Sequence, residues 1–270
     1  MPLHRKKIGL ALSGGAVLGI AHLGAIKVLE EHRIPIDLIA GTSAGSLVGA
    51  FLAAGYTSDE MFDLVKSLSW GKISKVTLPK MGLLNSKLLG RLVDTQVGRI
   101  DIKQLPKPYA AVAVDLTSGH QVILQTGLVS EAVRASCCIP GVFTPVIRGD
   151  QVLVDGGVLN FLPADVVRQM GADYVIAVKL KPGLAHDKRP DSIFQVLMNS
   201  FQLTIAQIAE HAPNGDITIM PDLSGLNPHD FRQADKLYQR GYEAATAIIQ
   251  KIEADLSRTA KRFSLFRWLK

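Results

Sequence analysis

The chain has 270 residues, of which 47% are hydrophobic and 20% charged, with a mean hydropathy of +0.21. This composition excludes general disorder, and the length fits a single large α/β domain over residues 1–270. The net charge of +6 and the pI near 9.3 favour anionic partners: nucleic acid, anionic lipid surfaces or acidic substrates.

The sequence contains no targeting or membrane-spanning signal. No stretch reaches the roughly 18 consecutive apolar residues of a spanning helix. The basic residues 4–7 lead into a short apolar run that Ser13-Gly14-Gly15 interrupts, short of the ~7–15 residues of a signal-peptide core. The two cysteines, Cys137 and Cys138, are neighbours and tie no distant segments together. We therefore expect a cytoplasmic protein.

Short β-type runs alternate with longer segments of helical period along the chain. The predicted strands are residues 8–12, 36–40, 109–116, 121–124, 152–154, 174–178 and 217–220. The predicted helices are residues 19–33, 44–54, 58–68, 86–97, 163–170, 192–211 and 231–256. Ser58 is the expected N-cap of the third helix, and residues 70–84 and 181–191 are expected to be exposed loops. The alternation predicts a sheet covered by helices on both faces.

The first predicted strand ends in a glycine-rich turn, Ser13-Gly14-Gly15-Ala16-Val17-Leu18-Gly19. Such a turn exposes several backbone N–H groups in one direction, which suits a phosphate or the oxyanion of a tetrahedral intermediate. A dinucleotide site needs G-x-G-x-x-G, and Ala16 stands where the middle glycine would be. The turn therefore fits acyl transfer better than nucleotide binding, although alone it is weak evidence.

The second predicted strand ends in Gly41-Thr42-Ser43-Ala44-Gly45, a G-x-S-x-G pentapeptide. A strand, a sharp turn and an apolar helix follow in the order that presents a serine hydroxyl at the edge of a sheet. Gly41 and Gly45 permit close approach of strand and helix, and the helix N-terminus supplies N–H groups. Small residues here can also serve packing alone, but the context favours Ser43 as a nucleophile.

A serine hydroxyl needs a base that takes its proton. None of the seven histidines stands at a strand end inside a glycine-flanked turn; they are His4, His22, His32, His120, His186, His211 and His229. Asp155 follows the predicted strand 152–154 directly and precedes Gly156 and Gly157, so its carboxylate can approach another strand end closely. An Asp-Gly-Gly hairpin turn is the equal alternative.

Together these three features resemble the patatin-like phospholipase family, which combines a glycine-rich oxyanion loop, a G-x-S-x-G elbow and a D-G-[GA] motif. Residues 22–24, 135–143 and 160–163 also match the family's pattern. The resemblance covers residues 8–180 as a catalytic core and leaves residues 181–270 as a C-terminal helical part with a basic, aromatic tail.

The resemblance implies a three-layer α/β/α fold with a largely parallel central sheet. It implies a carboxylic ester hydrolase, without metal or organic cofactor, in which a Ser43–Asp155 dyad cleaves phospholipid or lysophospholipid. The implied oxyanion hole uses the amides of Gly14, Gly15 and Ala16 with that of Ala44. The glycines that would support these motifs are Gly19, Gly41, Gly45, Gly156 and Gly157.

The chain departs from the family's pattern at two positions. Many members read G-G-G-x-[RK]-G, whereas this chain has Ala16 at the third glycine and Leu18 at the basic residue. Alanine still donates its amide if its φ stays negative. A lipid-binding or regulatory protein on a weakened hydrolase scaffold is therefore the alternative from another functional class.

Three further interpretations concern the C-terminal tail, a catalytic triad and the net positive charge. Lys261 to Lys270 combine cations and aromatics as interfacial segments do, without a clean amphipathic stripe, so contact with an anionic membrane and docking onto the domain stay equal alternatives. A triad α/β-hydrolase using a later histidine places its nucleophile later in the chain than Ser43. Nucleic-acid binding depends on net charge alone and is the weakest hypothesis.

Overall fold

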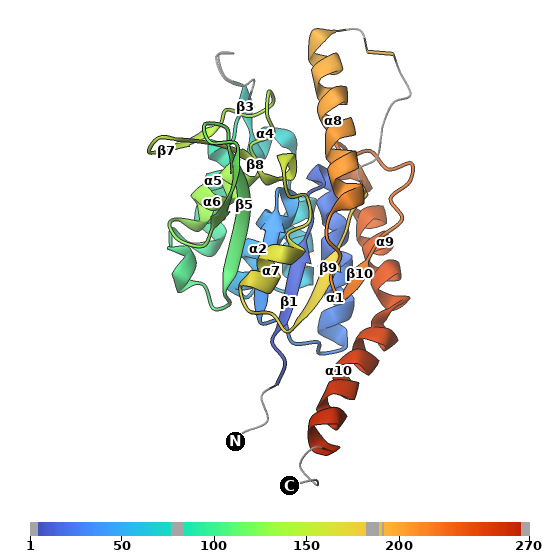
Figure 1. Ribbon diagram of the computed structural model, residues 1–270. Helices are drawn as coiled ribbons and strands as arrows, with labels where there is room; N and C mark the ends of the chain where they lie inside the picture. Colours follow the sequence, from blue (N-terminus) through green and yellow to red (C-terminus); the bar gives the residue numbers. More distant parts are fainter. Residues whose placement is uncertain (1–4, 77–83, 182–188, 191, 266–270) are drawn as a thin grey trace.

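The computed structural model describes residues 5–76, 84–181, 189–190 and 192–265. Its centre is an eight-stranded sheet in the order β10-β9-β1-β2-β5-β8-β7, with β6 paired to β5 (Figure 1). The strands are β1 Ile8–Leu12, β2 Leu38–Thr42, β5 Tyr109–Asp115, β6 His120–Leu124, β7 Val146–Arg148, β8 Gln151–Asp155, β9 Tyr174–Val178 and β10 Ile217–Ile219. A separate two-stranded ladder joins β3 (Lys75–Val76) to β4 (Leu84–Asn85).

The sheet is parallel over its first five strands and antiparallel beyond them. β10, β9, β1, β2 and β5 run in one direction. β6 and β8 pair antiparallel with β5, and β7 pairs antiparallel with β8. The parallel strands end at one common edge of the sheet, so the turns that follow β1 and β2 meet there.

Helices cover both faces of the sheet, as the predicted fold class requires. Alternate side chains of a strand point to opposite faces, and Leu10 and Leu12 of β1 join one core cluster while Ala11 joins the other. On the face of Ala11 lies α7 (Ala164–Gln169). The other core cluster is closed by α1 (Ala21–Glu31), α2 (Ala44–Ala54), α5 (Lys87–Val97), α6 (Val129–Ser136) and α9 (Ala234–Thr246). The three-layer α/β/α fold is confirmed.

The remaining helices are short or lie outside these layers. They are α3 Ser58–Lys66, α4 Trp70–Ile73, α8 Ile193–His211 and α10 Ile249–Leu265, with 3-10 turns at η1 Ala16–Ile20, η2 Ile102–Gln104, η3 Gly156–Val158 and η4 Phe231–Gln233. The prediction of a single helix over residues 231–256 is wrong. The structure forms η4, α9 and α10 there, with the helix interrupted after Gln233 and again after Thr246. The loop predicted over residues 70–84 contains α4 and β3, and residues 77–83 and 182–188 of the two predicted loops lie outside the described residues.

The N-cap of α3 also differs from the prediction. Thr57 caps the helix: its hydroxyl accepts the Glu60 amide, and the Glu60 carboxylate accepts the Thr57 amide. Ser58 instead donates its hydroxyl to Glu30 on α1. The reciprocal capping box satisfies two N-terminal amides, which a cap at Ser58 alone would not do.

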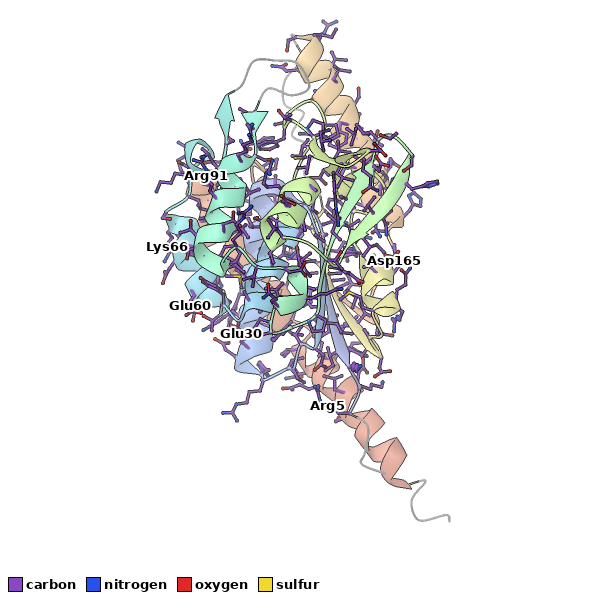
Figure 2. All side chains as sticks on the ribbon, turned by 90° about the vertical axis from the view of Figure 1, so that its left-hand side faces the viewer. Arg5, Glu30, Glu60, Lys66, Arg91 and Asp165 are labelled. Atoms are coloured by element: carbon purple, nitrogen blue, oxygen red, sulfur yellow. The ribbon has the colours of Figure 1, made fainter. Side chains whose placement is uncertain are left out.

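Two helices project from opposite ends of the molecule. α8 extends beyond the edge where the parallel strands end, and α10 extends from the other end, on the side of Arg5 (Figures 1 and 2). None of the helices in the described part of the chain is both long enough and apolar enough to cross a membrane. The side chains of the predicted membrane-contact segment, Lys261 to Lys270, lie outside the described residues.

Candidate active site

Ser43 occupies a sharp turn between β2, which ends at Thr42, and α2, which begins at Ala44. Its backbone has φ 53° and ψ −124°, a region that residues other than glycine rarely occupy. The Ser43 amide donates to Ser136 Oγ at 2.9 Å, which holds the turn in place. This strained geometry is that of a nucleophile elbow, which presents the hydroxyl at the edge of the sheet.

The glycines around the elbow allow backbone contacts that any side chain would prevent. A Cβ on Gly41 would lie 2.2 Å from the Gly45 carbonyl oxygen, and one on Gly45 would lie 2.3 Å from the Leu12 carbonyl oxygen. A Cβ on Gly19 would lie 2.6 Å from Ala44 Cβ, because η1 packs directly on the first turn of α2. These contacts bring the turn after β1 and the turn after β2 together.

Asp155 is placed beside Ser43 because β2 and β8 both pair with β5. Thr42 on β2 pairs with Val112 on β5, and Asp155 on β8 pairs with the next β5 residue, Ala113. Because β6 occupies the other edge of β5 along residues 111–115, β2 and β8 share one edge and end beside each other, which places Asp155 next to the elbow. A Cβ on Gly156 would lie 2.3 Å from the Val112 carbonyl oxygen, so this glycine permits the close turn after Asp155.

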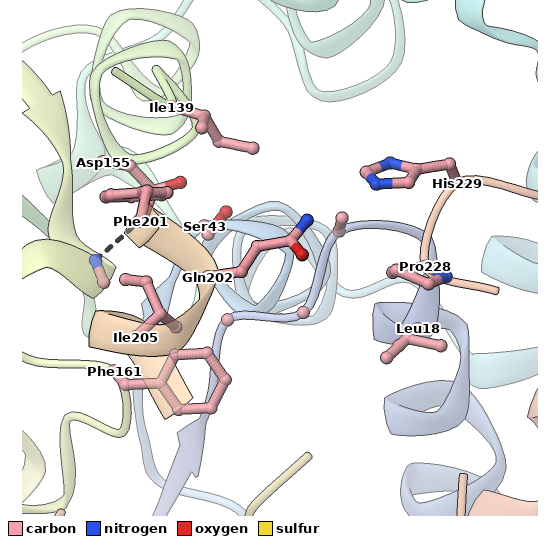
Figure 3. Close-up of a pocket in the computed structure, with 14 residues that line it drawn as sticks. Leu18, Ser43, Ile139, Asp155, Phe161, Phe201, Gln202, Ile205, Pro228 and His229 are labelled. Atoms are coloured by element: carbon pink, nitrogen blue, oxygen red, sulfur yellow. Dashed lines mark hydrogen bonds between the residues drawn. The ribbon is translucent and has the colours of Figure 1, made fainter. Parts of the chain in front are cut away.

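The Asp155 carboxylate is buried and directly connected to the elbow. It is 4% exposed, accepts the Gly157 amide at 2.8 Å (Figure 3) and lines the same pocket as Ser43. Burial raises the pKa of Asp155 to about 6, and the hydrogen bonds from Ser43 and Gly157 oppose that rise. A carboxylate with such a pKa is ionised at neutral pH and still accepts a proton more readily than one in water.

The glycine-rich turn offers fewer free amides than the sequence suggests. The Gly14 amide donates to the Phe161 carbonyl oxygen at 3.0 Å, so it is already occupied. Within the described residues, the amides of Gly15, Ala16 and Ala44 donate to no other group, and both Gly15 and Ala16 line the same pocket as Ser43. The predicted oxyanion donors are thereby reduced to Gly15, Ala16 and Ala44.

Ala16 and Leu18 adopt different roles from those expected at the sequence level. Ala16 has a φ of 49°, so the condition of a negative φ is not met, although its amide donates to no other group in the described residues. The turn is fixed by the Val17 amide, which donates to Pro228, and by the Leu18 amide, which donates to Gly15. Leu18 is 1% exposed and packs into the core, so a cation would have to be buried at this position.

Two cavities meet at Ser43. The first is a pocket lined by Ser43, Asp155 and Phe161 and by residues of α8, namely Phe201, Gln202 and Ile205 (Figure 3). The second also includes Ser43 and is otherwise lined almost entirely by apolar side chains, among them Leu23, Leu47, Val48, Val65, Leu68, Leu89 and Phe143. A third cavity shares Leu47 and Val48 with the second and extends to Met61 and Leu92.

One histidine, His229, lines the pocket although the sequence analysis did not identify it as a site residue. His229, in the irregular segment after β10, lines the pocket but lies across it from Asp155 (Figure 3), and burial lowers its pKa. His22 is buried, its Nε2 hydrogen-bonds the Ser13 carbonyl oxygen at 2.9 Å, and burial lowers its pKa to about 4. Elsewhere His32 contacts Glu253 and His211 contacts Gln207; His4 and His186 are outside the described residues. No local pattern marks His229 as a pocket residue.

Comparisons with known proteins show which family the chain resembles. A family model described as patatin-like phospholipase matches residues 10–168, more than half of the chain. Two uncharacterized NTE family proteins of Mycobacterium tuberculosis are similar: one is 32% identical, covering 91% of this chain and 47% of its own length, and the other 39% identical, covering 68% and 53%. Lysophospholipase NTE1 of Meyerozyma guilliermondii is 28% identical over 91% of this chain and 19% of its own length.

Solved structures show the same fold. VipD from Legionella pneumophila aligns with a TM-score of 0.59 at 15% identity, over 92% of this chain and 67% of that one. The type III effector protein ExoU aligns with a TM-score of 0.50 at 13% identity, over 92% and 53%. The chain spans about half the length of the first curated relatives it matches.

Proposed function

The chain belongs to the patatin-like phospholipase family, and from this we propose that it is a serine acyl hydrolase that cleaves lipid esters with Ser43 as nucleophile and Asp155 as base. The observation that carries the proposal is the juxtaposition of Ser43 on its strained elbow with the buried Asp155 carboxylate, at the junction of a pocket and an apolar cavity. His229, the described histidine in the pocket, lies across it from Asp155, which favours a dyad over a triad.

The reaction uses these groups in sequence. Ser43 Oγ attacks the acyl carbonyl carbon while Asp155 takes the hydroxyl proton. The amides of Gly15, Ala16 and Ala44 donate to the oxyanion, and each such donor lowers the barrier by roughly 2.7–4 kcal/mol. Asp155 then returns the proton to the leaving alcohol oxygen, which leaves an acyl ester on Ser43. A water molecule then loses a proton to Asp155 and its oxygen attacks this ester. As the bond between the acyl carbon and Ser43 Oγ breaks, Asp155 returns the proton to Ser43 Oγ and the carboxylic acid leaves.

The cavities favour a lipid as the substrate. An acyl chain is a string of methylene groups, and each gains about 0.8 kcal/mol on leaving water. The second and third cavities provide an apolar lining behind Ser43, from Leu47 and Val48 to Leu92. We assign them to the acyl chain and the pocket beside α8 to the rest of the ester. Phospholipid and lysophospholipid both fit this division, and the relative from Meyerozyma guilliermondii is named a lysophospholipase.

One observation supports the alternative of a lipid-binding protein on a weakened scaffold: the positive φ of Ala16, in the turn that would hold the oxyanion. A fluorophosphonate probe, which reacts only with an activated serine, separates the two functions. We expect labelling of the unsubstituted chain and none of Ser43→Ala. The same pair is then compared for release of fatty acid from phosphatidylcholine and lysophosphatidylcholine. Absence of labelling and of fatty-acid release in the folded chain would support the binding function instead.

A further inference from the structure

Exposed large hydrophobic side chains gather at the end of the molecule that holds Ser43. Among the described residues they are Leu116, Ile147, Leu159, Ile193, Val196, Leu197, Leu203 and Met220. Leu116 and Met220 directly follow the ends of β5 and β10, which are parallel to β2 and end at the same edge of the sheet as it does. Ile147 lies on β7, in the hairpin at that edge (Figure 1). A protein surface rarely concentrates apolar groups in this way without a partner.

Half of this set lies on α8, whose apolar surface is continuous from the exposed side to the pocket. Ile193, Val196 and Leu197 follow the i, i+3, i+4 spacing of one helix face, and Leu203 lies two turns beyond Val196 on the same face. Ile193 is 82% exposed and Leu197 63%. Phe201 and Ile205 follow Leu197 at i+4 and i+8, so they lie on the adjoining strip of the helix, and they line the pocket with Ser43. Residues 192–209 contain no charged side chain.

We propose that the outward face of α8, defined by Ile193, Val196, Leu197 and Leu203, inserts into the surface of a lipid bilayer and holds the pocket against it. The inference rests on the proposed function, because an ester with a long acyl chain resides in the bilayer and reaches Ser43 through the pocket that α8 borders. An apolar helix face without charges partitions into the boundary between headgroups and acyl chains.

Cations at the same end fit the phosphates of a bilayer surface. Arg148 ends β7 beside Ile147, and Arg189 comes shortly before α8; both are exposed. Basic side chains near an anionic bilayer each add about 1 kcal/mol of attraction, which falls with salt. Because cations lie at the same end as the apolar face, a lipid surface with phosphates fits this end better than a purely apolar groove on another protein does.

This surface replaces the tail as the expected membrane contact. α10, which leads into Lys261 to Lys270, projects from the opposite end of the molecule to α8 (Figures 1 and 2). A flat bilayer that meets α8 does not meet that end at the same time. Substitutions on α8 and substitutions in the tail should therefore have different effects on vesicle binding, depending on which of the two contacts the bilayer.

The test is flotation with large vesicles of phosphatidylcholine, with and without phosphatidylglycerol. Ile193→Gln/Leu197→Gln removes apolar contact without adding charge or weakening the helix. Lys261→Gln/Arg262→Gln is the matched change in the tail. We expect the α8 variant to bind vesicles at least ~10-fold more weakly, since each inserted Leu or Ile contributes about 1.5–3 kcal/mol and about 1.4 kcal/mol is tenfold. The tail variant should keep binding.

Hydrolysis of a short, water-soluble aryl ester is measured on the same samples and should be unchanged, so a failure of membrane binding is distinguished from a failure of catalysis. Vesicle binding that survives in the α8 variant, or that disappears in the tail variant alone, would overturn the inference. So would a lipid-free dimer of the unsubstituted chain, seen by light scattering, that the α8 substitutions dissociate while vesicle binding is absent. Circular dichroism checks that each variant is folded.

Discussion

Ser43 and Asp155 meet on one edge of β5, where β2 ends and β8 ends beside it, and the Asp155 carboxylate is only 4% exposed there. Because burial removes water from this carboxylate, protonation becomes easier and the pKa rises to about 6. The proposed mechanism asks Asp155 to accept a proton and return it in each half-reaction. A pKa near the working pH makes both directions accessible.

The first prediction is the pH dependence of the reaction. Acylation needs ionised Asp155, so kcat/KM for a short aryl ester should rise with pH, with a midpoint near the Asp155 pKa of about 6, and level off above it. The measurement is kcat/KM between about pH 4.5 and about pH 8.5 at constant ionic strength. A profile that is flat across this interval would show that no group with this pKa controls acylation.

The second prediction concerns the stability of Asp155→Asn. The pKa of Asp155 is raised from 3.8 to about 6, so the folded chain holds this proton over an interval in which the unfolded chain has lost it. The unfolding free energy therefore carries a penalty from Asp155 that is absent below about pH 4 and complete above about pH 6. Relative to the unsubstituted chain, the variant should gain up to about 3 kcal/mol between about pH 4 and about pH 8, at about 1.36 kcal/mol per pKa unit.

Urea unfolding of both chains at the two pH values measures this difference. The amide introduced by Asp155→Asn keeps an oxygen that accepts the Gly157 N–H, so the comparison isolates the buried charge. A variant that is less stable than the unsubstituted chain by the same amount at both pH values would contradict a raised pKa.

The third prediction tests the packing of the elbow. Gly45→Ala places a Cβ 2.3 Å from the Leu12 carbonyl oxygen, so strand and helix must separate. We expect a loss of roughly 1–3 kcal/mol in unfolding free energy and loss of probe labelling at Ser43. Gly71→Ala is the control, because its Cβ meets nothing within 4 Å. Equal stability and labelling of the two variants would refute the packing role of Gly45.

The fourth prediction assigns the acyl chain to the apolar cavities. Val48 lines both the second and the third cavity, so Val48→Phe should block the passage between them. Hydrolysis of a hexadecanoyl ester should fall by at least ~10-fold relative to that of a butanoyl ester, since several methylene groups at about 0.8 kcal/mol each lose their site. Leu92→Phe, which narrows only the third cavity, should affect the longest chains alone. An unchanged ratio of the two rates would place the acyl chain elsewhere.

The fold was largely predictable because the parallel strands are short, mostly apolar runs that alternate with segments of helical period. β1, β9 and α2 match the predicted bounds residue for residue. The helix α6 and the strand β7 were missed, since β7 has only three residues and little apolar pattern. The antiparallel direction of β8 depends on pairing between distant segments, which no local signal encodes.

The candidate site was predictable where it depends on turns and not where it depends on tertiary packing. Ser43 and Asp155 each follow an apolar strand and precede a glycine or a small-residue helix, and the structure brings them together. The occupied Gly14 amide and the positive φ of Ala16 follow from contacts with the distant Phe161 and Pro228 segments. The contribution of Phe201 from α8 likewise depends on how that helix docks.

The most direct test of the dyad is lysophosphatidylcholine hydrolysis by Asp155→Asn, measured beside Ser43→Ala and His229→Ala at about pH 8. Removing the base should lower kcat by about 10²–10⁴-fold while the variant stays folded, and His229→Ala should remain active. The account would be contradicted if Asp155→Asn kept the activity of the unsubstituted chain while His229→Ala lost it, because His229 would then be the base.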